Sequence, residues 1–194
     1  MLVGDVFDTQ TITLITYYVL LIGGFIVQGA TEEFLCRGIV LHTLKERTPT
    51  WFAITVSTIL FIIPHWSSLF GGGMTYGVIG VANLVLISII FSLLTIRFKS
   101  IWVACGLHSF WNAILYCILG LDLSGNDETV TAVFNMQSVG NNIWNGGVYG
   151  IEASLITTAT LTFAAILIMV IGRKNPVLGV KQTDWLKTNK CHAK

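Results

Sequence analysis

Five blocks of apolar residues, each about as long as a membrane-spanning helix, dominate this chain. The blocks cover residues 12 to about 30, 51–69, 76–98, 101–119 and 151–172. A helix needs about 20 predominantly apolar residues to cross the roughly 30 Å hydrocarbon layer of a bilayer. The first block is expected to continue as a helix through Leu44. The sequence therefore predicts an all-α fold, a polytopic transmembrane helix bundle with about five membrane-spanning helices.

The composition supports a single integral membrane domain over residues 1–194, with the lipid bilayer as its surroundings. Hydrophobic residues make up 54% of the chain and charged residues only 11%, with a mean hydropathy of +0.75. Soluble domains carry about a quarter charged residues, so a soluble enzyme is excluded. The formal net charge of +1 leaves no basic surplus for phosphates. We therefore expect no nucleic-acid partner.

Charges in the loops predict how the chain is oriented in the membrane. All basic residues except Arg37 fall on one side of the predicted bundle, and the opposite side carries only acidic ones, namely Asp5, Asp8, Asp122, Asp127 and Glu128. The positive-inside rule then places the N-terminus outside and the C-terminus in the cytoplasm. Residues 173–194 form a cytoplasmic tail in this scheme. Residues 120–150 form an extracytoplasmic loop long enough to be a partial lid or a re-entrant segment.

Several ionisable and amide side chains lie inside the apolar blocks, where they are costly. They are Glu32, Glu33, Arg37, His42, His65, His108, Asn83 and Asn112. An ionisable group costs on the order of 3 kcal/mol in a bilayer on insertion scales, so such groups face the bundle interior and mark functional sites. His42 lies near the boundary and is left outside the predicted site. Asn83 is expected to link helices, and Trp66, Trp102 and Trp111 to pack or anchor at the interface.

Depths counted along the helices bring these groups together. At about 1.5 Å per residue, Glu32 lies roughly 20 Å from Lys45, and His65 about 20 Å from Trp51. His108 and Asn112 lie about 12 Å and 18 Å from Ser100 by the same count. Three helices therefore present polar groups at similar depth. We expect them to converge on one enclosed, water-containing cavity toward the cytoplasmic half of the membrane.

Helical spacing assigns local geometry to these residues. Glu33 and Arg37 are four residues apart, with the Glu first, which favours an ion pair. Glu32 lies about 100° around the helix from Glu33, so its carboxylate can point elsewhere and remain available for chemistry. His108 and Asn112 are also four residues apart and can point at one oxygen. Pro64 is expected to kink the second helix beside His65.

These residues form three motifs in order: EExxxR at Glu32–Arg37, FxxxH at Phe61–His65 and HxxxN at His108–Asn112. In that order they resemble the motifs of the CPBP intramembrane proteases. This group contains CAAX prenyl proteases and Abi-like bacterial relatives linked to bacteriocin processing and immunity. The resemblance covers residues 28–116, which we take as the motif-bearing protease core.

The resemblance implies a role for each motif residue. Glu32 and His65 would hold and activate a water for attack on a peptide carbonyl, and His108 with Asn112 would stabilise the oxyanion. Glu33 and Arg37 would be supporting residues, with Arg37 orienting Glu33. No cofactor or metal is then needed.

The resemblance also implies a substrate and a location. The expected function is an intramembrane endopeptidase that cleaves a membrane-associated peptide or a lipidated protein from the cytoplasmic side of a bacterial plasma membrane. Members of the family usually carry further helices before the EExxxR helix. A second copy of the chain, and hence an oligomer, could supply a partner for the outer side of this helix.

Three alternatives follow from the same residues. A zinc ion held by Glu32, His65 and His108, with an open water position, would also hydrolyse peptides. A non-catalytic membrane scaffold or immunity protein would bind a peptide or partner without needing an ionised Glu32. A transporter or proton relay also uses buried Glu and His residues, but the five helices show no paired inverted halves.

Overall fold

The computed structural model describes residues 9–121, 132–134, 136 and 140–174, and in these ranges it contains helices and no strand. The α-helices are α1 (Thr9–Glu33), α2 (His42–Lys45), α3 (Thr50–Ile62), α4 (Trp66–Leu69), α5 (Met74–Phe98), α6 (Trp102–Ala113) and α7 (Leu155–Lys174). Two π-helices, η1 (Phe34–Leu41) and η3 (Ile114–Leu119), and three short 3₁₀ turns, η2 (Ile63–His65), η4 (Gly147–Tyr149) and η5 (Ile151–Ala153), complete the fold. The all-α prediction is confirmed.

Four helical stretches are long and apolar enough to cross a membrane. They are Ile12–Lys45, Thr50–Leu69, Met74–Phe98 and Trp102–Leu119, and a shorter apolar helix covers Leu155–Ile171. The predicted continuation of the first helix through Leu44 is confirmed. Large apolar side chains on these helices face outward, such as Leu20 at 69% exposure and Val27 at 66%. An outward apolar surface of this kind is suited to lipid and makes the chain an integral membrane protein.

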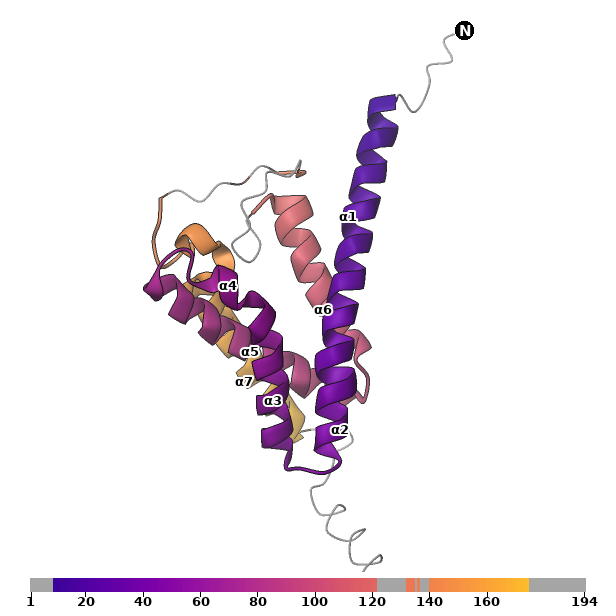
Figure 1. Cartoon of the computed structure of the whole chain (residues 1–194), viewed down its shortest axis with the longest axis vertical. Coiled ribbons are helices and arrows are strands. Elements are labelled where there is room, and N and C mark those ends of the chain that lie inside the picture. The colour runs from indigo at the N-terminus through magenta and orange to yellow at the C-terminus, as the bar shows by residue number, and fades with distance from the viewer. Residues whose placement is uncertain (1–8, 122–131, 135, 137–139, 175–194) are drawn as a thin grey trace, which may run out of the picture.

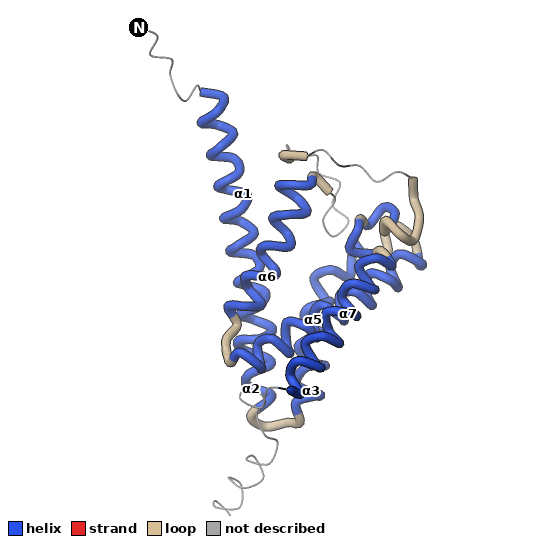
Figure 2. The backbone as a smooth tube through the Cα atoms, turned by 180° about the vertical axis from the view of Figure 1, so that it is seen from behind, coloured by secondary structure: helices blue, strands red, loops and turns tan. Residues whose placement is uncertain are grey.

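The helices form two arms that meet at one end and diverge toward the other (Figures 1 and 2). One arm is the long first helix packed along α6, and the other contains α5, α7 and the segment from α3 to α4. The arms meet where α2 is joined to α3 and where α6 begins. They diverge toward the end at which α1 starts (Figure 2).

Local sequence explains two breaks in the helices. Pro64 lies in the 3₁₀ turn η2 between α3 and α4, so the predicted kink is present beside His65. The last long helix begins at Leu155, later than the predicted start at residue 151. Gly150 has a positive φ of 95°, and the extended Ser154 caps the helix through its Oγ, which accepts a bond from Thr157 N at 3.1 Å. A Ser at this position satisfies a free amide of the first turn.

Polar side chains link α5 to α7. Asn83 donates to the carbonyl oxygens of Glu152 at 2.8 Å and Ser154 at 3.0 Å, and its Oδ1 accepts a bond from Thr158 at 2.7 Å. Near the other end, Arg97 donates to the carbonyl of Ile168 at 2.9 Å. The prediction that Asn83 links helices is therefore confirmed.

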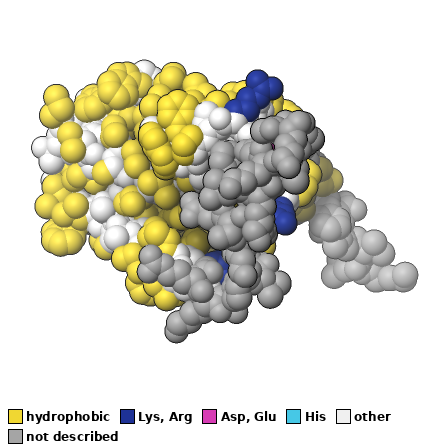
Figure 3. Space-filling view, turned by 90° about the horizontal axis from the view of Figure 1, so that it is seen from below, with side chains coloured by type: hydrophobic (Ala, Val, Ile, Leu, Met, Phe, Trp, Pro, Cys, Tyr) yellow, Lys and Arg dark blue, Asp and Glu magenta, His cyan; other side chains and the backbone are white. Residues whose placement is uncertain are grey.

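Basic residues gather at the end where the arms meet. Lys45 and Arg47 follow the first helix, and Arg97 and Lys99 close α5. Figure 3 looks at this end and shows dark-blue Lys and Arg side chains among hydrophobic ones. His42 pairs with Glu46 at 3.7 Å in this region, with both side chains exposed, so His42 lies outside the candidate site as predicted.

The helices α1 and α6 approach each other closely at Gly29. A Cβ atom at Gly29 would lie 2.6 Å from Ser109 Oγ and 3.1 Å from the Ser109 backbone nitrogen. Small residues allow membrane helices to pack this tightly. We therefore expect Gly29→Leu to lower the free energy of unfolding in detergent by about 1–3 kcal/mol, the usual range for overpacking.

Gly24 provides the matched control because a Cβ atom there would meet nothing within 4 Å. Gly24→Leu should leave the unfolding transition close to that of the unmodified protein. Equal losses of stability in the two variants would show that Gly29 has no special packing role.

Candidate active site

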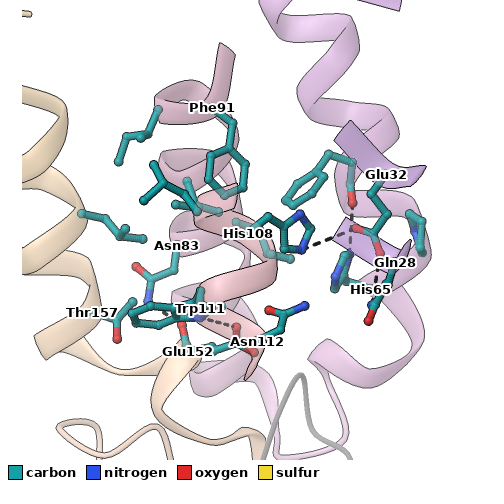
Figure 4. Close-up of a pocket in the computed structure, with 18 of the residues that line it drawn as sticks. Gln28, Glu32, His65, Asn83, Phe91, His108, Trp111, Asn112, Glu152 and Thr157 are labelled. Atoms are coloured by element: carbon teal, nitrogen blue, oxygen red, sulfur yellow. Dashed lines mark hydrogen bonds and ion pairs between the residues drawn. The ribbon is translucent and has the colours of Figure 1, made fainter. Parts of the chain in front are cut away.

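A cavity of about 670 Å³ lies between the two arms and collects the predicted site residues. Glu32 from α1, His65 from η2, and His108 and Asn112 from α6 all line it. Figure 4 shows these side chains around one space. The predicted convergence of three helices on one cavity is therefore confirmed.

Glu33 and Arg37 lie behind the cavity wall as a buried ion pair. Arg37 Nη1 donates to Glu33 Oε1 at 2.9 Å, and both side chains are fully buried. Arg37 Nη2 also reaches α5, where it donates to Ser88 Oγ at 2.6 Å and to the Ser88 carbonyl at 3.2 Å. The predicted ion pair is present, and it ties the first helix to α5.

Two phenylalanine rings enclose the ion pair and the imidazole of His108. The Arg37 guanidinium lies 4.5 Å from the Phe61 ring centroid and 5.4 Å from that of Phe91, within cation–π range. The His108 ring stacks on Phe91 with centroids 5.5 Å apart. Phe61 is the first residue of the FxxxH motif, so its role here is to hold charged and aromatic neighbours in place.

His108 lies between the two glutamates of the EExxxR motif. Its Nδ1 is 3.1 Å from Glu33 Oε1, and its Nε2 is 3.9 Å from Glu32 Oε2. A carboxylate only accepts hydrogen bonds, so Nδ1 donates to Glu33. The chain Arg37–Glu33–His108 thereby orients the imidazole and directs Nε2 toward Glu32.

Glu32 is turned away from Arg37, as the 100° offset predicted. Gln28, one turn earlier on α1, donates from Nε2 to Glu32 Oε1 at 3.2 Å. The Glu32 side chain keeps 24% of its surface exposed, whereas the Glu33 side chain keeps none. Two adjacent carboxylates thus have different environments, one structural and one facing the cavity.

His65 has one nitrogen bound to the backbone. Its Nδ1 lies 3.0 Å from the carbonyl oxygen of Phe61, one turn earlier. A carbonyl oxygen accepts, so Nδ1 carries the hydrogen and Nε2 of the neutral ring is an acceptor. His65 is therefore set up to accept a hydrogen bond from a water in the cavity.

A π-helix follows each of the two helices that carry the EExxxR glutamates and the HxxxN motif. The α-helix α1 ends at Glu33 and continues as η1, and α6 ends one residue after Asn112 and continues as η3. π-helical turns are rare and occur frequently at functional sites. Their placement next to both motifs supports a functional role for this cavity.

The cavity has a second carboxylate that sequence reasoning missed. Glu152 in η5 lines it, and Trp111 Nε1 donates to Glu152 Oε1 at 3.0 Å. Trp111 thus also lines the cavity, which the sequence did not predict. Glu152 is in the fifth predicted apolar block, and a charged residue inside such a block was a signal of a specific role.

Metal ligation can be tested against the arrangement of the donors. No group of three His, Cys, Asp or Glu side chains placed to hold a metal ion is found among the described residues. His108 Nδ1 is engaged with Glu33 and His65 Nδ1 with Phe61, which leaves the two Nε2 atoms facing the cavity. Whether Glu32, His65 and His108 act with or without a metal ion stays a prediction.

The cavity lies in the half of the bundle away from the Lys and Arg end. The α1 residues that line the cavity lie between Phe25 and Glu32. Tyr116 from η3 and Tyr149 from η4 line it as well. If the basic end faces the cytoplasm, the cavity lies toward the other side of the membrane, contrary to the depth-based expectation.

Together, long apolar helices and a polar cavity between them define a polytopic membrane protein with an intramembrane site. The family described as type II CAAX prenyl endopeptidase Rce1-like matches residues 14–114, which include all three motifs. The match covers more than half of the chain, so the protein belongs to this Rce1-like family. No curated protein and no solved structure matched the chain. Family membership supports a CAAX-type endopeptidase acting on a membrane-associated peptide or protein.

Proposed function

We propose that the protein is an intramembrane endopeptidase in which Glu32 and His65 activate a water and His108 and Asn112 stabilise the oxyanion. The observation that carries the proposal is the cavity that these four residues share. The buried Arg37–Glu33–His108 chain beside it supports the proposal, because it fixes the imidazole without using Glu32.

The chemical step requires only groups at the cavity wall. His65 Nε2 accepts a hydrogen bond from the water, and Glu32 takes a proton from it as the oxygen attacks the peptide carbonyl carbon. The carbonyl oxygen becomes an oxyanion. When the C–N bond breaks, Glu32 returns the proton to the leaving nitrogen, which yields a carboxylic acid and an amine.

The oxyanion needs donors that are placed before the reaction starts. The Asn112 side-chain amide donates without any change of protonation. His108 already donates through Nδ1 to Glu33, so Nε2 donates to the oxyanion only when the ring is an imidazolium. We therefore propose that His108 acts in its doubly protonated form.

A chelator separates this scheme from zinc catalysis. Because we propose that Glu32 and His65 activate the water without a metal ion, we expect the purified protein to keep its peptidase rate after treatment with 1,10-phenanthroline and removal of the chelator. A thermolysin-type protease in the same detergent would verify that the treatment removes zinc. A lost rate that returns on adding Zn²⁺ would assign Glu32, His65 and His108 as metal ligands instead.

The sequence predicted both that the basic end faces the cytoplasm and that the cavity lies toward the cytoplasm. We propose that the first prediction, which follows from the positive-inside rule, gives the orientation. The N-terminus is then outside, the basic end is cytoplasmic, and the cavity lies toward the extracytoplasmic side. Cysteines placed at Arg47 and at Trp144, in otherwise cysteine-free protein in intact bacteria, should report this with a membrane-impermeant maleimide. Labelling at residue 144 alone is expected, and labelling at residue 47 alone would establish the opposite orientation.

The location and substrate complete the proposal. We propose the bacterial plasma membrane, and a membrane-associated peptide, such as a bacteriocin precursor or a lipidated protein, as the class of substrate. A single-span peptide library presented to the purified protein in lipid nanodiscs tests this function, with cleavage products read by mass spectrometry. Selective binding of a peptide that Glu32→Gln leaves unchanged, with no cleavage, would favour a scaffold or immunity protein.

A further inference from the structure

The charge of the cavity wall is one-sided. Among the described residues that line it, Glu32 and Glu152 carry carboxylates and none is a Lys or Arg. The basic side chain nearest in sequence to the site, Arg37, is fully buried and bonded to Glu33 and Ser88. A substrate in this cavity therefore meets acidic groups and no guanidinium or ammonium group from these residues.

The sequence extends this asymmetry beyond the cavity wall. Residues 1–36, 48–96 and 100–172 contain no Lys or Arg. Charges of one sign around a cleft with low-dielectric walls attract the opposite charge. A carboxylate that enters a largely apolar cavity would lose hydration and would meet no Lys or Arg among the described lining residues.

Glu152 stands among aromatic residues at one part of the cavity. Trp111 donates to its Oε1 at 3.0 Å, and Tyr149 and Tyr116 also line the cavity. A carboxylate has about four acceptor positions, so the indole bond does not exclude a second donor. Aromatic faces beside a carboxylate are suited to a Lys, Arg or amino-terminal cation.

The two carboxylates are separated by the oxyanion-site candidates. In Figure 4, Glu32 with Gln28 lies on one side of His108 and Asn112, and Glu152 with Trp111 lies on the other. Glu152 comes from η5 and Trp111 from α6, so their bond also joins the two arms of the bundle. A peptide whose carbonyl reaches His108 and Asn112 would place a neighbouring residue beside Glu152.

We propose that Glu152 and Trp111 form a specificity subsite for a positively charged group of the substrate, close to the bond that is cleaved. This inference rests on the proposed peptidase function and names its substrate class: a membrane-associated peptide with a basic residue or an amino terminus near the cleavage site. Trp111 acts as a positioning residue for the Glu152 carboxylate.

The test uses the best peptide from the nanodisc library, made with Lys, Gln or Glu at successive positions around its cleavage site. For the unmodified protein we expect kcat/KM at one position to be on the order of tenfold higher with Lys than with Gln, and lowest with Glu. Glu152→Gln keeps an acceptor for Trp111 but removes the charge. It should bring the Lys-to-Gln ratio to about one, and Glu152→Lys should make Glu the preferred residue.

Glu46→Gln is the matched control, because Glu46 is an exposed carboxylate at the opposite end of the bundle, and it should preserve the Lys preference. A Lys-to-Gln ratio that Glu152→Gln leaves unchanged, or a preference of the unmodified protein for Glu, would overturn the subsite. Binding of the same peptides to Glu32→Gln protein gives a second readout that needs no cleavage. If Glu32→Gln protein binds the Lys peptide more tightly than the Gln peptide, and the Glu32→Gln/Glu152→Gln double variant does not, the subsite is upheld even if the peptidase function fails. Equal binding of the Lys and Gln peptides to Glu32→Gln protein would refute the subsite.

Discussion

Replacing Glu32 by Gln is expected to lower kcat for peptide hydrolysis by roughly a thousandfold, within the range that a general base contributes. Gln has the same size and can still bond to Gln28, but it cannot take a proton from water. The amount of folded protein should stay unchanged, because Glu32 is only partly buried and, unlike Glu33, does not pair with the buried Arg37. Initial rates on the library-derived peptide, with size-exclusion profiles of both proteins, measure this.

Glu46→Gln serves as the control for this experiment as well. Among the described residues, the Glu46 carboxylate forms an ion pair only with the exposed His42, at 3.7 Å. The rate of Glu46→Gln should match that of the unmodified protein. If Glu32→Gln keeps more than about a tenth of the rate, Glu32 is not the general base. In that case the water would have to be activated by another group at the cavity wall.

Replacing Arg37 by Met should give the largest loss of stability, about 3–5 kcal/mol of unfolding free energy, because it strands a buried charge. Glu33 would lose its 2.9 Å partner while remaining fully buried, and Ser88 would lose two hydrogen bonds. Equilibrium unfolding in mixed detergent micelles, followed by tryptophan fluorescence, measures the change.

The double variant Glu33→Gln/Arg37→Met removes both charges and should recover a large part of that loss. Arg97→Met is the control at the helix end, where Arg97 bonds to a carbonyl and no carboxylate is left behind. Its loss should be smaller than that of Arg37→Met. Equal stability of Arg37→Met and the double variant would show that the ion pair is not what stabilises this region.

Local contacts in the site were predictable from the sequence because helical geometry determines them. Four-residue spacing placed Glu33 against Arg37 and set Glu32 apart from both. The high cost of polar groups in a bilayer explains why Glu32, His65, His108 and Asn112 share one cavity. Residue spacing and the cost of burying polar groups were therefore sufficient to predict the Glu33–Arg37 pair and the shared cavity.

Contacts between distant segments were not predictable in the same way. Ser88 lies within an apolar helix, and nothing in its neighbourhood indicates that Arg37 reaches it from 51 residues away. Glu152 depends on the path of the segment before α7, including the turn at Gly150. Counting residues along a helix measures depth but not the direction in which helices diverge, so it does not determine to which side of the membrane the cavity opens.

Hydrolysis in H₂¹⁸O with hydroxylamine present tests the central claim, direct attack of an activated water, most directly. We predict that the product with the new carboxyl group carries one ¹⁸O there, that no hydroxamate forms, and that Glu32→Gln protein forms this product roughly a thousandfold more slowly. A hydroxamate would reveal an acyl-enzyme and therefore a nucleophilic side chain in place of water. That product, or equal cleavage by the Glu32→Gln protein, would contradict the mechanism proposed for this cavity.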